Sequence, residues 1–95
     1  MQNTVADKLQ TIVTIVNRLG LHARPAMALV DVANTFPCEI TLARKNQSVN
    51  AKSVMEVLLL AATQGSELTI TAKGDKAQEA LDALSDLVAR GFDED

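Results

Sequence analysis

The chain has 95 residues, a formal net charge of −3, 47% hydrophobic residues and 22% charged residues. This length allows one domain with its own core and leaves no room for a second. The negative charge and the absence of Trp and Tyr argue against a nucleic-acid-binding protein. Such proteins rely on basic patches and on aromatic side chains that stack on bases.

The single cysteine, Cys38, cannot form a disulfide within the chain, and no signal peptide or long apolar run is present. We therefore expect a cytoplasmic protein without membrane insertion. We expect one domain over residues 1–95, with a loose N-terminal extension over residues 1–8, where no hydrophobic period is evident.

The first half of the chain alternates between strand and helix signals. Residues 9–16 are rich in Thr, Ile and Val and predict a strand, with Val13 and Ile15 in the core. Apolar residues then recur at helical spacing and predict a helix that ends before Pro37. The expected buried stripe of this helix consists of Ala26, Leu29, Val30 and Ala33.

Alternating residues then predict a β-hairpin. The first strand covers residues 38–43, with Cys38 filling the core, and the second covers residues 47–50, with Val49 pointing inward. The polar residues 44–46 form the turn between them.

The segment Ser53-Val54-Met55-Glu56 has the S-x-x-E form of a capping box, so we expect a helix that runs to about Thr63 and stops at Gly65. One apolar stripe on this helix consists of Val54, Val57, Leu58 and Ala61, and a second consists of Met55, Leu59 and Ala62. Either the core-facing stripe is wide, or the second stripe is an exposed patch that docks a partner.

The last elements are a strand over residues 67–73 and a long helix capped by Asp75. The buried stripe of this helix consists of Ala77, Ala80, Leu81, Leu84, Leu87 and Val88. Gly91 stops the helix, and residues 92–95 form a solvated acidic tail. The order βαββαβα predicts an α+β fold, a two-layer sandwich with a four-stranded antiparallel sheet.

The only histidine, His22, lies in a short stretch between the first strand and the first helix. Gly20 permits a tight turn, and Pro25 suits the first turn of a helix. A helix start and the donors of Arg24 favour a phosphate, so this stretch is suited to a nucleophilic imidazole that accepts a phosphoryl group. No second His or Cys completes a metal site, and no cofactor motif is present, so we expect neither metal nor cofactor.

Two motifs resemble a known family. Leu21-His22-Ala23-Arg24-Pro25-Ala26 resembles the active-site motif of HPr, the histidine phosphocarrier of the bacterial phosphotransferase system. Residues 49–55 resemble the segment around the regulatory serine of that family, at the family's spacing. The similarity runs from about residue 9 to residue 92. Ala26-Met27 and the ending 91–95 resemble the nitrogen-related branch, NPr.

The resemblance implies the open-faced HPr sandwich, with three helices on one face of the sheet. It also implies that Nδ1 of His22 takes a phosphoryl group from phosphorylated Enzyme I, ultimately from phosphoenolpyruvate, and passes it to an EIIA-type acceptor, with Arg24 stabilising the phosphate. Such a protein is a monomeric carrier and not a stand-alone enzyme. The alternative is a regulatory binding module that controls partners according to its phosphorylation state. Sugar uptake and nitrogen regulation both stay open.

The first two helices dock partners in the family, which implies a docking surface that includes Met27, Val54, Met55 and Leu59. Ser53 matches the serine that an HPr kinase phosphorylates in some relatives. Glu56, however, stands where glycine is common in the kinase-regulated relatives, and its carboxylate would repel a phosphate. Ser53 is therefore a helix cap as well as a candidate regulatory phosphoserine.

Overall fold

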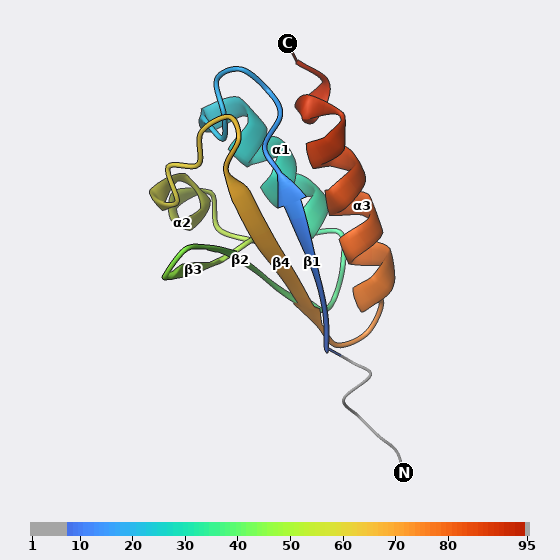
Figure 1. Cartoon of the computed structure of the whole chain (residues 1–95). Helices are drawn as coiled ribbons and strands as arrows, with labels where there is room; N and C mark the ends of the chain where they lie inside the picture. Colours follow the sequence, from blue (N-terminus) through green and yellow to red (C-terminus); the bar gives the residue numbers. More distant parts are fainter. Residues whose placement is uncertain (1–7, 95) are drawn as a thin grey trace.

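The computed structural model describes residues 8–94, which form a sheet covered by helices (Figure 1). The elements in chain order are β1 (Lys8–Thr14), α1 (Ala23–Ala33), β2 (Glu39–Arg44), β3 (Gln47–Asn50), α2 (Val54–Leu59), β4 (Glu67–Lys73), α3 (Ala77–Ala89) and the short turn η2 (Gly91–Asp93). Lys8, expected in the loose extension, is the first residue of β1, and the rest of that extension lies outside the described residues.

The sheet has four antiparallel strands in the order β1-β4-β2-β3. The central strand β4 pairs with β1, so that Val13 lies opposite Leu68, and with β2, so that Leu42 lies opposite Ile70. The helices cover one face and leave the other open, which confirms the predicted fold (Figure 1). The C-terminal end of α3 lies beside the loop between β1 and α1 (Figure 1).

The core is aliphatic and lies between the sheet and the helices. Every second residue of β2 and β4 points into it, because side chains alternate between the two faces of a strand. The predicted stripes of the first and last helices are buried in full. Ile15, Val49 and Cys38 are buried as predicted, whereas Val13 is only partly buried.

The second helix is shorter than predicted. It ends at Leu59 rather than at Thr63, and Ala61 takes a left-handed conformation with φ of 50°. This break turns the chain so that Leu60 and Ala62 are both buried. A continuous helix could not place side chains two positions apart on one face, so packing overrides the helical pattern here.

The start of the last helix also differs from the prediction. Lys76, not Asp75, is the capping residue, and its φ of 64° is left-handed. No side chain caps this helix, and Gln78 donates a hydrogen bond to Asp82 instead of reaching back to the cap.

Candidate functional site

A tight turn at Gly20 positions the loop that carries His22. Gly20 has φ of 71°, and a Cβ atom at this position would lie 2.5 Å from the carbonyl oxygen of Ala62. The next residue, Leu21, donates its backbone N–H to the same oxygen at 2.8 Å. Only glycine allows this close approach of two backbones, so the loop is fixed against the segment after α2.

His22 lies at the N-terminus of α1, as expected. It is the capping residue, with extended backbone angles, and its carbonyl accepts the first helical hydrogen bond from Ala26 at 2.9 Å. Its side chain makes no capping bond, so the imidazole is available for other contacts. The N–H groups of Ala23 and Arg24 lie in the first turn, where a helix offers donors and a partial positive charge to an anion.

The imidazole is held by a carboxylate from the other end of the chain. Nε2 of His22 lies 2.9 Å from Oε1 of Glu94, and the two side chains are 38% and 22% exposed. The buried Asn17 donates one amide hydrogen to the same Oε1 at 2.9 Å and the other to the carbonyl oxygen of Gly20 at 2.8 Å. Asn17 therefore ties the glycine turn to the C-terminal segment.

Two arginine side chains line the same hollow as this carboxylate. A shallow open hollow is lined by His22, Glu94, Arg18, Leu19 and Arg24. The hydrogen bond with His22 lowers the pKa of Glu94 below its ordinary value of 4.5, and Asn17 and the charge of Arg24 act in the same direction, whereas desolvation opposes them. The guanidinium of Arg24 has no hydrogen-bond or ion-pair partner among residues 8–94 and is exposed beside the ring. It is therefore available to a bound phosphate.

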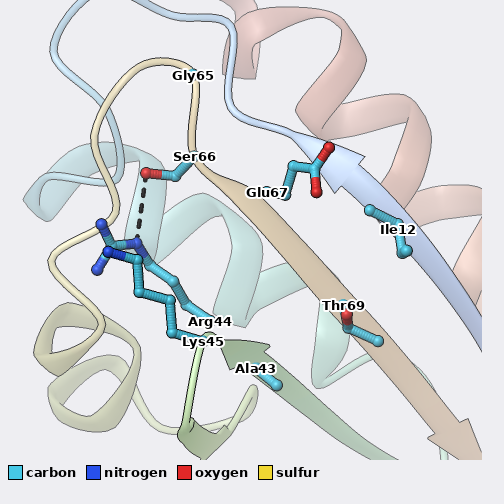
Figure 2. Close-up of a pocket in the computed structure, with 8 residues that line it drawn as sticks. All are labelled: Ile12, Ala43, Arg44, Lys45, Gly65, Ser66, Glu67 and Thr69. Atoms are coloured by element: carbon cyan, nitrogen blue, oxygen red, sulfur yellow. Dashed lines mark hydrogen bonds between the residues drawn. The ribbon is translucent and has the colours of Figure 1, made fainter.

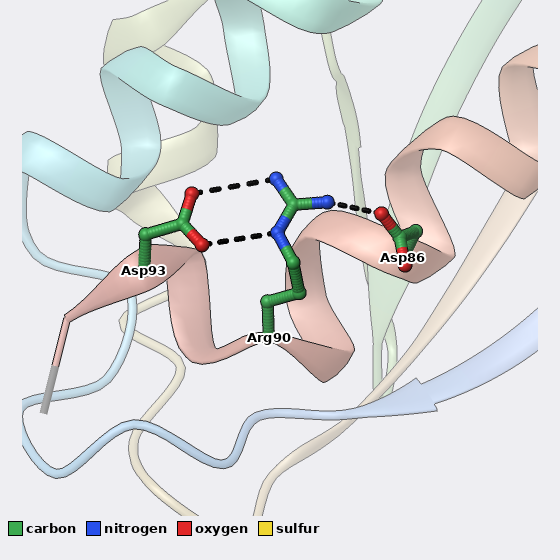
Figure 3. Close-up of polar contacts among 3 residues, drawn as sticks. All are labelled: Asp86, Arg90 and Asp93. Atoms are coloured by element: carbon green, nitrogen blue, oxygen red, sulfur yellow. Dashed lines mark hydrogen bonds and ion pairs between the residues drawn. The ribbon is translucent and has the colours of Figure 1, made fainter.

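Residues 92–94 do not form the solvated tail that we expected for residues 92–95, and Asp95 lies outside the described residues. The Arg90 side chain binds Asp93 through Nε at 3.0 Å and also binds Asp86 (Figure 3). The chain thereby folds back and brings Glu94 to His22. Glu94 was not among the predicted site residues, because the acidic run resembles a solvated end.

Ser53 caps α2 as predicted, and its hydroxyl accepts a hydrogen bond from the Glu56 backbone N–H at 3.3 Å. The reciprocal half of the capping box does not form, because the Glu56 carboxylate accepts from the backbone N–H of Asn50 at 3.0 Å. Asn50, the last residue of β3, therefore takes the place of Ser53 as the backbone donor to Glu56.

We use the term apolar patch for Met27, Val54, Met55 and Leu59, which lie on α1 and α2. Met27, Met55 and Leu59 are 54%, 77% and 65% exposed, whereas Val54 is partly buried against the core. The two helices pack against each other, so the patch spans neighbouring surfaces.

The predicted buried stripe on the second helix is partly wrong. Val57 is fully buried, but Leu58 is 37% exposed and Ala61 is exposed. Ala62, assigned to the adjoining stripe, is 3% exposed. The early end of the helix causes the differences at Ala61 and Ala62, because residues beyond Leu59 no longer follow the helical period.

A larger hollow lies away from His22, at the end of the β2–β3 hairpin (Figure 2). Its Arg44 guanidinium donates to the hydroxyl of Ser66 at 3.4 Å and to the carbonyl of Leu60 at 3.4 Å. This arginine therefore braces the loop between α2 and β4. None of the predicted site residues lines this hollow.

In the described part of the chain, no helix has the length and apolar character needed to cross a bilayer. No group of three or more His, Cys, Asp or Glu side chains within residues 8–94 could hold a metal ion.

A family model and individual relatives all relate this chain to the same kind of protein. A family model described as "PTS HPr component phosphorylation site" matches residues 9–90. The phosphocarrier protein HPr of Pseudomonas aeruginosa is 45% identical over 83 residues, which cover 86% of this chain and 92% of the relative. The phosphocarrier protein NPr of Proteus mirabilis is 49% identical over 85 residues, which cover 87% of this chain and 93% of the relative.

Solved structures agree with the sequence relatives. HPr-C-His from Thermoanaerobacter tengcongensis matches with a TM-score of 0.88 and 39% identity, covering 92% of this chain and 98% of that one. The phosphocarrier protein HPr from Bacillus anthracis matches with a TM-score of 0.82 and 42% identity, covering 85% and 96%. The motif around His22, the fold and these matches together show that the chain belongs to the HPr family of phosphocarrier proteins of the phosphotransferase system.

Proposed function

We propose that the chain accepts a phosphoryl group on His22 from phosphorylated Enzyme I and passes it to an EIIA-type acceptor. The observation that carries the proposal is the position of His22, half-exposed at the N-terminus of α1 beside Arg24, in a family of phosphocarriers. One ring nitrogen attacks phosphorus, and the bond between phosphorus and the donor breaks as its electron pair returns to the donor. Transfer to the acceptor reverses these steps.

The surrounding groups position the phosphoryl group and stabilise its charge. The first backbone N–H groups of α1 and the guanidinium of Arg24 donate to the phosphate oxygens. The protein acts as a monomeric cytoplasmic carrier and not as a stand-alone enzyme, because the partners supply the donor and the acceptor. The apolar patch docks those partners next to His22.

The apolar patch also favours a second candidate function, a regulatory module that controls partners according to the phosphorylation of His22. The NPr relative from Proteus mirabilis makes the nitrogen-related branch a reasonable setting for this role. An HPr kinase acting on Ser53 remains a separate prediction. It is weakened by the Glu56 carboxylate, which is held by the backbone N–H of Asn50 close to the cap.

The test is incubation of the purified chain with Enzyme I, Mg²⁺ and phosphoenolpyruvate, followed by addition of an EIIA protein. We expect acid-labile, base-stable phosphate on the chain and its loss to EIIA. His22→Ala, which removes only a half-exposed side chain, should fold and take no phosphate. Phosphate on that variant would refute the site, and binding to Enzyme I without any transfer would favour the regulatory module.

A further inference from the structure

Glu94 occupies a position that couples it directly to the chemistry of His22. Its Oε1 atom lies 2.9 Å from Nε2 of His22 and accepts a second hydrogen bond from Asn17 at 2.9 Å. The family model matches residues 9–90, so Glu94 lies beyond the matched residues.

The backbone before Glu94 is strained in a way that fixes its position. Gly91, Phe92 and Asp93 have φ values of 65°, 58° and 60°, all left-handed. For the two residues with a Cβ atom this conformation is unfavourable, so it persists only where other contacts impose it. Phe92 is 8% exposed, and the backbone N–H of Glu94 donates to the carbonyl of Gly91 at 3.1 Å.

A second set of contacts fixes the same turn. Arg90 makes paired contacts with Asp93, through Nε at 3.0 Å and Nη2 at 3.4 Å (Figure 3). A Cβ atom on Gly91 would lie 3.6 Å from the Cβ of Asn17, so the turn packs closely against the residue that also binds Glu94. The placement of the carboxylate is thus specified by the fold and is not a chance contact of a loose end.

We propose that Glu94 is a positioning residue that holds the proton of neutral His22 on Nε2 and so keeps the lone pair on Nδ1, the atom that attacks phosphorus. A carboxylate only accepts hydrogen bonds, so a neutral imidazole at this distance must donate from Nε2. Nδ1 has no hydrogen-bond or ion-pair partner among residues 8–94, so no such contact engages its lone pair.

The inference rests on the proposed phosphocarrier function. In the transfer step no proton has to enter or leave the imidazole ring. The Nδ1 lone pair forms the new N–P bond, while the bond from phosphorus to the donor breaks and its electron pair stays with the donor. The ring keeps its Nε2 proton and gains a positive charge, against which the Glu94 carboxylate lies. Onward transfer returns the N–P electron pair to Nδ1, so the carboxylate serves both directions.

The position of the proton can be measured directly, because the chain has a single histidine. Two-dimensional spectra of ¹⁵N-histidine-labelled protein, recorded above the titration range of the ring, distinguish the Nδ1–H and Nε2–H tautomers. We expect the Nε2–H tautomer in the unsubstituted chain and a larger share of Nδ1–H in Glu94→Ala. Glu94→Gln should restore the Nε2–H tautomer, since its amide oxygen still accepts a hydrogen bond.

Transfer kinetics provide the second readout. Loss of one charge-assisted hydrogen bond predicts that Glu94→Ala takes phosphate from Enzyme I about tenfold more slowly. The control is Glu79→Ala, which removes the same charge from an exposed position on α3 and should change neither readout.

The two readouts separate the possible failures. An unchanged tautomer in Glu94→Ala, with or without slower transfer, would overturn the positioning role. A shifted tautomer with an unchanged transfer rate would also overturn it, because the proton position would then not govern attack. If the unsubstituted chain takes no phosphate at all, the proposed function fails instead, and the spectra of the same samples still decide whether Glu94 sets the tautomer.

Discussion

His22 and Glu94 are 72 positions apart in the chain, yet their side chains meet at 2.9 Å. Asn17 links this pair to the Gly20 turn, because its amide group donates to both Glu94 and the Gly20 carbonyl. The candidate site is therefore assembled from the loop after β1, the start of α1 and the segment after α3. A substitution in any of the three segments should therefore alter the position or the hydrogen bonding of the imidazole.

Arg24→Ala should slow phosphotransfer in both directions by about tenfold or more, because a charge-assisted contact to the phosphate is lost. The fold should be unaffected, since the side chain is exposed. Arg24→Lys should restore part of the rate, because it keeps the charge but not the planar set of donors. The measurement is the rate of phosphate uptake from Enzyme I and release to EIIA, with Lys73→Ala as a control that removes a distant positive charge. Equal rates for Arg24→Ala and the unsubstituted chain would exclude Arg24 from the mechanism.

Gly20→Ala should destabilise the chain by about 2 kcal/mol or more, because the added Cβ meets the Ala62 carbonyl oxygen at 2.5 Å in addition to the cost of a positive φ. Gly65→Ala is the matched control. Its φ of 91° is also positive, but a Cβ atom there has nothing within 4 Å. The control should lose only about 1 kcal/mol. Urea unfolding of both variants measures the difference, and equal losses would show that the backbone contact at Gly20 is unimportant.

Short-range sequence patterns correctly predicted the strands and helices whose buried face follows from the spacing of apolar residues. The alternation in residues 67–73 and the helical stripe from Ala77 to Val88 each correspond to a face that must be buried, and both are confirmed. The end of α2 could not be predicted in this way, because Ala61 turns left-handed to bury Leu60 and Ala62 against the rest of the molecule.

The candidate site shows the same division. The position of His22 before a helix followed from Gly20, Pro25 and the apolar period, all within a few residues. The contact between His22 and Glu94 joins segments that are 72 positions apart in the chain. The spacing of apolar residues within a segment cannot predict a contact of this kind. One signal was available: Phe92, an apolar residue after the stop at Gly91, indicates a chain that packs back onto the core.

Met55→Glu should leave stability nearly unchanged, because the side chain is 77% exposed and no cavity forms. It should weaken binding to Enzyme I, because a charge would have to be desolvated in the interface. The matched control is Val57→Ala on the same helix, which removes a fully buried side chain and should lose about 2 kcal/mol while keeping the patch intact. The two measurements are the unfolding midpoint and the affinity for Enzyme I. Retained affinity in Met55→Glu would remove Met55 from the docking surface.

The contacts of Glu94 also predict a pH dependence of stability. Its folded-state pKa is lowered, chiefly by the hydrogen bond with His22 and further by Asn17 and the charge of Arg24. A carboxyl group with a lowered pKa in the folded state contributes stability that is fully present above its unfolded pKa. That contribution disappears as the pH falls from about 4.5 through the folded-state value.

The variant Glu94→Gln isolates this contribution, because a neutral amide resembles the protonated acid at every pH. Above pH 5, we expect the unsubstituted chain to be more stable than Glu94→Gln, since only the ionised carboxylate makes charge-assisted bonds to His22 and Asn17. As the pH falls below about 4, the two free energies of unfolding should converge. Urea unfolding of both proteins at pH 6, 5, 4 and 3 measures the gap. A gap that stays constant over this range, or widens toward low pH, would show that Glu94 is not held as a carboxylate against the imidazole in solution.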